Sequence, residues 1–403
     1  MTGRRKLILA TALAGAIAAL GVGQHALDLK ASVATVQAPR FEVDPLWPKP
    51  LPNHWVLGNV IGVGVDANDH VFIVHRNDTF DARNEIGAAQ NPPLSECCVP
   101  APPVLEFDPQ GNLVKAWGGP PADGKYVWPS SNHGIAVDNK NNIWIGGNGG
   151  GAGGAGGDSH ILKFTHDGTF LMQIGQPNQP TNSNSTTHFG RVAKISFDYK
   201  ANEAFVADGY GNRRVAVLDM NDGKIKRFWG AYGKPPSDSQ LPPYEPGQPQ
   251  PSFRNPVHCA EPSVDGLLYV CDRVNDRIQV FKEDGEFVKE KIIKPATKGD
   301  GSVWDIAFSK DPQQKYIFLA DGKNEKVYVM DRQSLEIITE FGDGGRQPGQ
   351  WFAVHSIATD SKGNVYTTET YRGQRLQKFV YKGLAPVTTP NQGTVWPTRT
   401  GGN

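Results

Sequence analysis

The sequence has no excess of charge of either sign and almost no long hydrophobic runs. Among its 403 residues, 41 Lys and Arg balance 41 Asp and Glu, so the formal net charge is zero. Without a block of basic residues there is no electrostatic support for binding nucleic acid, and we expect no such partner. Apart from one N-terminal segment, no apolar stretch is long enough to span a bilayer.

Cysteine is also scarce. Only four cysteines occur and no CxxC motif is present, so we assign them to loop staples or free thiols rather than to a metal site. Cys259 and Cys271 lie on the first two strands of one repeat, where a cross-strand disulfide is feasible. The neighbouring Cys97 and Cys98, in a proline-rich loop, cannot easily bond to each other without strain.

The one long apolar run lies at the N-terminus. Arg4, Arg5 and Lys6 precede an apolar stretch from residue 7 to about residue 22, which is the pattern of a secretory signal. We therefore expect three parts: residues 1–34 as a signal peptide or an uncleaved N-terminal anchor, 35–383 as the main domain, and 384–403 as a C-terminal tail. The protein should be periplasmic or extracellular, and it should meet a membrane only if the first segment stays uncleaved.

Glycine and proline are abundant, 46 and 31 residues, and are spread through the chain, as expected for short strands joined by turns. A strand that ends in a polar turn recurs at residues 60–66, 132–138, 192–198, 257–263, 303–309 and 354–360. Each copy continues into further strands. Copies four and five share the turn D-x-x-N-x-[RK], and copy three has the same turn with one more residue between Asp208 and Asn212. Six units of roughly 45–70 residues predict an all-β, six-bladed β-propeller. The last unit lacks a fourth strand, which either residues 36–43 or the tail around Val395 could supply.

Three histidines occupy one equivalent position in alternate copies of this repeat. When the copies are aligned on their last residue, this position holds Ile61, His133, Ala193, His258, Trp304 and His355. In a closed ring the three imidazoles would stand about 120° apart around the central axis. Three neutral imidazoles that converge, with one coordination position open, are the ligand set of a catalytic zinc site. We therefore predict that His133, His258 and His355 bind zinc.

Four further residues follow the second strands of their copies: Arg76, Tyr210, Arg273 and Tyr371. In a propeller this loop and the start of the first strand lie on one face, so these side chains should overlook the histidines. A phenol beside a metal ion can exchange a proton with substrate, and guanidinium groups suit a carboxylate or carbonyl. We name Tyr210, Arg76 and Arg273 as candidate catalytic residues. His75 is left out, because it neighbours Arg76 on a strand and should point the other way.

The repeats resemble NHL-repeat propellers, and the set of site residues resembles the peptidyl-α-hydroxyglycine α-amidating lyase family. That family's HRG, PHG and SDGYCNSR elements are matched here by HRN (75–77), NHG (132–134) and ADGYGNRR (207–214). Its second metal histidine, followed by ADR, is matched by His258 and CDR (271–273), and its PHD element by VHS (354–356). The similarity spans about residues 57–380. It implies an NHL-type propeller with zinc on the three histidines and Tyr210, Arg76 and Arg273 at the reacting group.

The chain departs from that family at several positions. The aspartate that takes part in the family's structural calcium site is Ser356 here, whereas the two positions that would supply backbone carbonyls to the ion are Val63 and Ile135. The resemblance therefore implies calcium only with a reduced ligand set. Ala353 replaces a methionine, and the loops within 76–102 and 146–160 have no counterpart. We expect the substrate pocket to differ accordingly.

Together these features predict a metal-dependent carbon–nitrogen lyase that acts on a carbinolamide-like, N-substituted α-hydroxy group. The substrate would be a small molecule or a peptide, and the protein a monomer. Two alternatives remain. One is a metal-dependent lactonase-type hydrolase, although such sites use an axial cluster of carboxylates that the histidine position lacks. The other is a non-catalytic NHL propeller that binds peptide or protein partners.

Overall fold

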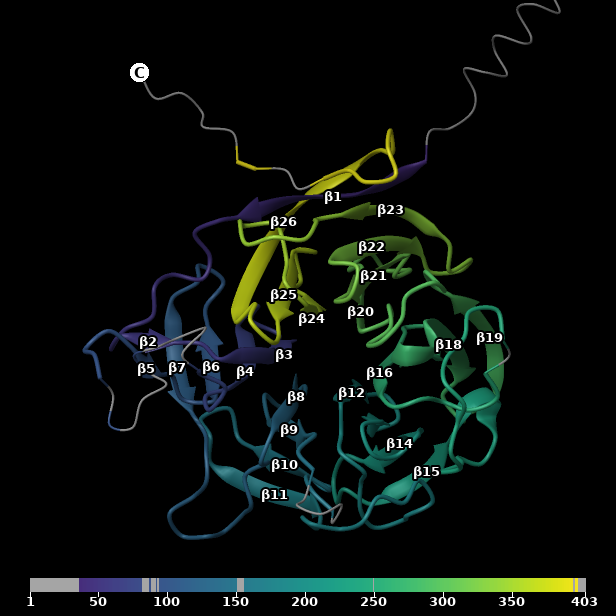
Figure 1. Cartoon of the computed structure of the whole chain (residues 1–403), viewed down its shortest axis with the longest axis horizontal. Coiled ribbons are helices and arrows are strands. Elements are labelled where there is room, and N and C mark those ends of the chain that lie inside the picture. The colour runs from purple at the N-terminus through teal and green to yellow at the C-terminus, as the bar shows by residue number, and fades with distance from the viewer. Residues whose placement is uncertain are drawn as a thin grey trace, which may run out of the picture.

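The expected six-bladed β-propeller is confirmed. The computed structural model describes residues 36–81, 87, 92, 94–150, 156–248, 250–393 and 396–397. These residues form six four-stranded antiparallel sheets arranged around a central axis (Figure 1). In this part of the chain no helix has the length and apolar character needed to cross a membrane. The predicted signal or anchor, residues 1–34, lies outside the described residues.

The blades follow one another along the chain. Blade 1 consists of β3 (Asn59–Val65), β4 (Val71–Arg76), β6 (Val104–Phe107) and β7 (Leu113–Trp117). Blade 2 consists of β8 (Asn132–Val137), β9 (Ile143–Gly147), β10 (His160–Phe164) and β11 (Phe170–Gly175). Blade 3 consists of β12 (Lys194–Asp198), β13 (Glu203–Asp208), β14 (Arg214–Asp219) and β15 (Ile225–Trp229).

The second half of the ring has the same plan. Blade 4 consists of β16 (Val257–Pro262), β17 (Leu267–Asp272), β18 (Arg277–Lys282) and β19 (Phe287–Ile292). Blade 5 consists of β20 (Asp305–Phe308), β21 (Tyr316–Asp321), β22 (Lys326–Asp331) and β23 (Ile337–Phe341). Blade 6 consists of β24 (Val354–Thr359), β25 (Val365–Glu369), β26 (Arg375–Pro386) and β1 (Gln37–Asp44). Outside the blades lie the short pair β2 (Trp55–Val56) and β5 (Val99–Pro100), and the 3₁₀ segments η2 (Ala231–Gly233) and η3 (Arg273–Asn275).

The N-terminal strand completes the last blade. β1 runs antiparallel to β26, with Gln37 opposite Pro386 and Asp44 opposite Lys378, and Figure 1 shows the two strands side by side. Of the two segments that the sequence offered for this position, the N-terminal one is therefore correct. Because this pairing joins segments from both ends of the chain, it closes the ring and leaves no gap between its ends. β26 also runs past residue 383, the predicted end of the domain.

The six repeat segments form the first strands, which line the axis (Figure 1). In the segments that close with an aspartate, its carboxylate accepts hydrogen bonds from the backbone of the turn that follows. Asp138 Oδ1 accepts from the N–H groups of Lys140 and Asn142, both at 2.9 Å, and Asp66 and Asp360 make the same pair of bonds in their blades. A carboxylate that satisfies two turn N–H groups fixes where the strand ends. These turns therefore set the register from the first to the second strand.

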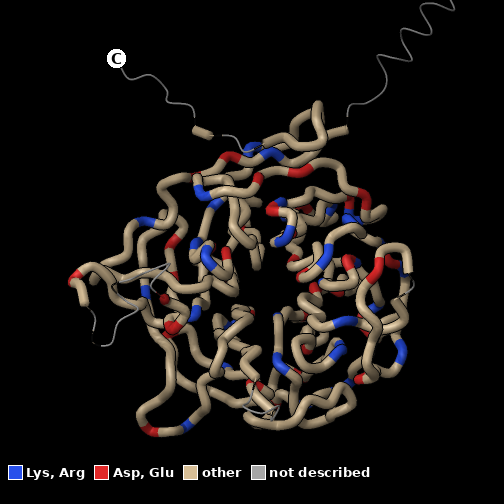
Figure 2. Tube along the Cα trace, viewed as in Figure 1, with Lys and Arg blue, Asp and Glu red and all other residues tan. Residues whose placement is uncertain are grey.

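Six hydrophobic clusters in the described residues lie between neighbouring blades, one at each junction of the ring. The largest fully buried side chains include Trp144, Trp304 and Trp351. Lys and Arg are interspersed with Asp and Glu around the ring (Figure 2). Cys259 and Cys271 form the expected cross-strand disulfide, and Cys97 is joined to Cys98, contrary to our expectation that these vicinal residues would stay apart.

Candidate metal centre

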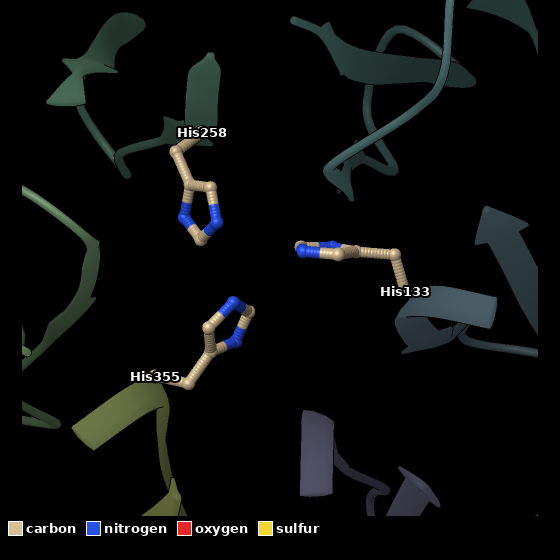
Figure 3. A group of neighbouring side chains, drawn as sticks. All are labelled: His133, His258 and His355. Carbon is tan, nitrogen blue, oxygen red and sulfur yellow. The ribbon is translucent and has the colours of Figure 1, made fainter. Parts of the chain in front are cut away.

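Three histidines converge on the axis of the ring. His133, His258 and His355 reach inward from β8, β16 and β24, and Figure 3 shows their rings turned toward one another. One ring nitrogen of each lies within 4.8 Å of the other two, and the ring centroids are 4.9–5.3 Å apart. All three residues are at most 3 % exposed. This arrangement can hold a metal ion.

The alternate positions of the same repeat column orient these rings. Nδ1 of each histidine donates to a backbone carbonyl of the next blade, in the pairs His133–Ala193 (2.8 Å), His355–Ile61 (2.6 Å) and His258–Trp304. A carbonyl oxygen only accepts, so each neutral ring carries its proton on Nδ1 and has a lone pair on Nε2. The three non-histidine members of the column thus fix both the orientation and the tautomer of the ligands.

Burial keeps the three imidazoles neutral. It lowers the pKa of His355 from 6.5 to about 3, with a further contribution from the charge of Arg273. The pKa values of His133 and His258 also lie well below their ordinary value, chiefly because of burial and then because of His355 and Arg273 respectively. Since a metal binds only the neutral imidazole, the ligands are ready for metal at neutral pH.

The lowered pKa values predict how acid affects the metal-free protein. In the unfolded chain histidine takes up a proton near pH 6.5, whereas in the folded chain these rings remain neutral to a much lower pH. Their contribution to stability is therefore present above about pH 6.5 and is lost as the pH falls toward the folded value. Each ring should remove up to about 1.4 kcal/mol of unfolding free energy per pH unit. Denaturant unfolding in chelator between about pH 7 and pH 5 should show a smaller slope in His355→Gln; equal slopes would contradict this assignment.

Tyr210 lies directly against the histidines. Its Oη is 2.8 Å from Nε2 of His133 and 3.1 Å from Nε2 of His258. A phenol has one proton and can donate to only one of these two lone pairs. The other Nε2 lone pair then faces the phenol oxygen with no proton between them. A cation bound to the nitrogens would remove this repulsion. The three histidines could therefore hold a metal ion, and the hydroxyl of Tyr210 lies against two of them.

Arg273 connects this tyrosine to the next blade. It donates from a terminal nitrogen to Tyr210 Oη at 3.3 Å, and its guanidinium lies 4.5 Å from the centre of the Trp304 ring. The residue is 6 % exposed, and its Nε has no hydrogen-bond partner among the described residues. The nearest carboxylate is Asp300, 3.8 Å away. A buried guanidinium with an unused donor is suited to an anionic substrate group.

Arg76 is held at the edge of the site by blade 2. Its Nε donates to the carbonyl of Asn132 at 3.2 Å, and a terminal nitrogen donates to Asn148 Oδ1 at 2.7 Å. Burial lowers the pKa of Arg76, and the charge of Tyr210 is the largest of the influences that oppose this shift. The structure thus places Arg76 close enough to interact electrostatically with Tyr210, although its hydrogen bonds go to the backbone and to an asparagine.

The repeat turn explains why Tyr210 and Arg273 stand where they do. Asp208 accepts from Asn212 and Arg214 at 2.8 Å each, and from the N–H of Gly190 at 2.7 Å. Tyr210 lies inside this closed turn. Blade 4 repeats the arrangement around the buried Asp272, and Arg273 follows that aspartate directly. This turn, in which the aspartate binds the asparagine and the arginine that follow it, is therefore a structural clamp that presents the one or two residues after the aspartate to the axis.

Of the other positions considered in the sequence, only Tyr371 lies near this centre. Tyr371 is 49 % exposed, with its ring 6.5 Å from that of Trp304, so the surroundings of the site reach solvent on this side. His75 points away from the axis: it accepts from Gly58 N–H and bonds to the carbonyl of Pro102. Val63 and Ile135 line a different space, a cavity of about 560 Å³ that begins two residues beyond the histidines on the first strands.

Comparison with known proteins gives distant relatives. The chain is 27% identical to peptidylglycine alpha-amidating monooxygenase of Rattus norvegicus over 329 residues, which are 78% of this chain and 30% of that protein. It is 28% identical to peptidyl-glycine alpha-amidating monooxygenase B of Xenopus laevis, over 58% of this chain and 24% of that protein. The chain thus spans less than a third of these relatives.

A second kind of relative is matched almost end to end. NHL repeat-containing protein 3 of Mus musculus is 23% identical over 86% of this chain and 85% of its own length. No protein-family model matches the chain. The resemblance is confirmed. The chain is a six-bladed propeller that is similar to an NHL repeat-containing protein and to peptidylglycine amidating enzymes.

Three features of the centre were not found in the sequence. The carbonyls of Ile61, Ala193 and Trp304 orient the ligands, but a backbone acceptor leaves no mark on the side chain. Asn148, which holds Arg76, lies at the start of a glycine-rich stretch, and this composition indicates only a loop. For the stacking of Arg273 on Trp304 the sequence gives one indication. Trp304 occupies the same repeat position as the histidines and should therefore lie near the axis.

Proposed function

We propose that this chain is an exported zinc-dependent lyase that breaks the C–N bond of an N-substituted α-hydroxy acid. The observation that carries this proposal is the phenol of Tyr210 between the Nε2 atoms of two of three converging histidines. A metal-ligand set with an acid–base group in direct contact is an arrangement for catalysis rather than for structure alone. A zinc ion on the three histidines would supply positive charge to stabilise the oxygen anion that develops in this reaction.

The residues divide the chemistry between them. Tyr210, as a phenolate, accepts the proton of the substrate's α-hydroxyl group. The electron pair of that O–H bond forms the new C=O bond as the C–N bond breaks, and the departing nitrogen takes up the proton that Tyr210 accepted. The products are an amide and an α-keto or aldehyde acid. Arg273 donates to Tyr210 Oη and so helps to hold the phenol oxygen in place.

The two arginines also suit the acid group of such a substrate. Arg273 has a buried, unused Nε donor, and the guanidinium of Arg76 is held by Asn148. The relatives named for amidating peptidylglycine support a peptide that ends in α-hydroxyglycine as one substrate class. Since the chain spans only part of those relatives, the substrate class is a proposal for this protein.

Arg76→Ala is expected to raise KM more than it lowers kcat, because the guanidinium binds the carboxylate in the ground state as well as in the transition state. Steady-state kinetics at saturating zinc would measure both. Asn148→Ala keeps the arginine and removes only the amide that holds it, so it should raise KM less. A fall in kcat with an unchanged KM would assign Arg76 to the chemical step instead.

A substrate-class assay tests the proposed reaction. Purified protein would be offered α-hydroxyglycine-ended peptides, small N-acyl-α-hydroxy acids and lactones. Release of glyoxylate from either of the first two is expected. Turnover of lactones alone would favour the hydrolase, and failure with all three classes while metal is bound would favour a non-catalytic binding propeller.

A further inference from the structure

A group of opposite charges lies at the wall of the axial cavity that Val63 and Ile135 line, and two of its members, Lys194 and Glu261, line the cavity themselves. The ammonium group of Lys194 is 2.7 Å from Asp305 Oδ1 and 2.8 Å from Glu261 Oε1. The three side chains are 15 %, 1 % and 17 % exposed in that order. Neither the metal centre nor the proposed reaction uses any of them.

This group links four consecutive blades. Lys194 lies on β12, Glu261 on β16 and Asp305 on β20. The second oxygen of Asp305 accepts from the backbone N–H of Ile357 on β24 at 3.0 Å, and Glu261 also accepts from the hydroxyl of Ser196 at 2.7 Å. One ammonium group and two carboxylates thus connect blades 3, 4, 5 and 6 at the centre of the ring.

The lysine is charged where it lies. Burial alone would lower the pKa of Lys194, but the nearby carboxylates of Asp305 and Glu261 outweigh burial and raise it above its ordinary value. Burial raises the pKa of Asp305, and Lys194 opposes that shift. Two carboxylates that face each other across a narrow space need a cation between them, and the chain supplies one.

The same cavity contains the positions at which calcium was expected. Val63 and Ile135 line it together with Lys194 and Glu261. Calcium takes about 6–8 oxygen ligands, carboxylates among them. Ser356, in place of an aspartate, has its hydroxyl bonded to the carbonyl of Ile61 at 2.8 Å, and the central carboxylates already neutralise an ammonium group. The residues present therefore do not fit a calcium ion while Lys194 is in place.

We propose that the ammonium group of Lys194 fills a cation site formed by Glu261 and Asp305. It stabilises the centre of this propeller in place of a bound structural ion. The ring then closes around its axis without calcium. If Lys194 is removed, the carboxylates of Glu261 and Asp305 are left as a pair of anionic oxygen ligands that a free divalent cation can bind.

The test is thermal unfolding in calcium-free buffer and after addition of calcium chloride to millimolar concentration. We expect the unfolding temperature of the wild-type protein to stay the same. Lys194→Met keeps most of the side-chain volume but leaves both carboxylates unpaired, so it should unfold roughly 5 °C lower. Calcium should then raise its unfolding temperature and magnesium should do so less, because magnesium accepts irregular sites poorly.

The control is the triple variant Lys194→Met, Glu261→Gln, Asp305→Asn, which removes the whole charge set. It should fold even if the single variant does not, and calcium should leave its unfolding temperature unchanged. Stabilisation of the wild-type protein by calcium would overturn the proposal. So would a Lys194→Met variant as stable as the wild type, or one that folds and that calcium does not stabilise.

Discussion

Replacing Tyr210 by phenylalanine is expected to abolish most of the activity while the fold and the metal remain. The substitution removes only the hydroxyl group, which lies 2.8 Å from Nε2 of His133 and 3.1 Å from Nε2 of His258. General acid–base groups contribute roughly 10²–10⁴-fold to rate, and a loss of kcat in this range is the expected result. Zinc content measured on the same sample should equal that of the wild-type protein.

This result distinguishes a role of Tyr210 in proton transfer from a role in holding the metal. If the hydroxyl accepts the substrate proton, the phenylalanine variant should lose kcat and keep its affinity for an unreactive substrate analogue. Tyr371→Phe, at the exposed edge of the site, is the matched control and should retain most of its activity. Loss of zinc from Tyr210→Phe, or turnover equal to the wild type, would show that Tyr210 does not act as the proposed base.

Replacing His258 by alanine is expected to lower zinc affinity by orders of magnitude. The variant leaves two histidine ligands, and a two-histidine site lacks the third protein ligand that catalytic zinc sites have. His133 and His355 would also keep their carbonyl partners, so their orientation should survive. Competition with a zinc-binding dye would measure the change in dissociation constant.

His75→Gln is the control for that experiment. His75 is fully buried like the ligands but points away from the axis, toward Gly58 and Pro102. The substitution can cost stability, yet zinc affinity should be unchanged. Undiminished zinc content in His258→Ala would refute the assignment of these three histidines as the metal ligands.

Much of the fold could be predicted because the same residue pattern recurs along the chain, once for each blade. A first strand that ends in a polar turn recurs in each blade, and the spacing of the repeats within this one chain places Asp66, Asp138 and Asp360 in equivalent turns. Ring closure could not be predicted in the same way. The partner of β26 begins more than 300 residues earlier in the chain, and alternating side chains alone did not distinguish β1 from the tail.

The candidate site, like the fold, could be predicted from the sequence only in part. The three histidines could be found because they share one repeat position, and Tyr210 and Arg273 because they share the turn after the second strand. Whether Arg76 contacts the axis or blade 2 depends on side-chain conformation, and the structure gives its hydrogen bonds to Asn132 and Asn148. The ion pairs of Lys194 could not be predicted from the sequence, because its partners, Glu261 and Asp305, belong to other blades.

The most direct test of the central claim is zinc depletion and reconstitution of the wild-type protein, with glyoxylate release from an N-acyl-α-hydroxyglycine as the readout. We predict that the chelated protein stays folded and loses its activity, and that activity returns linearly up to about one equivalent of zinc per chain. Full activity in protein shown to contain no metal would contradict a metal-dependent lyase built on His133, His258 and His355.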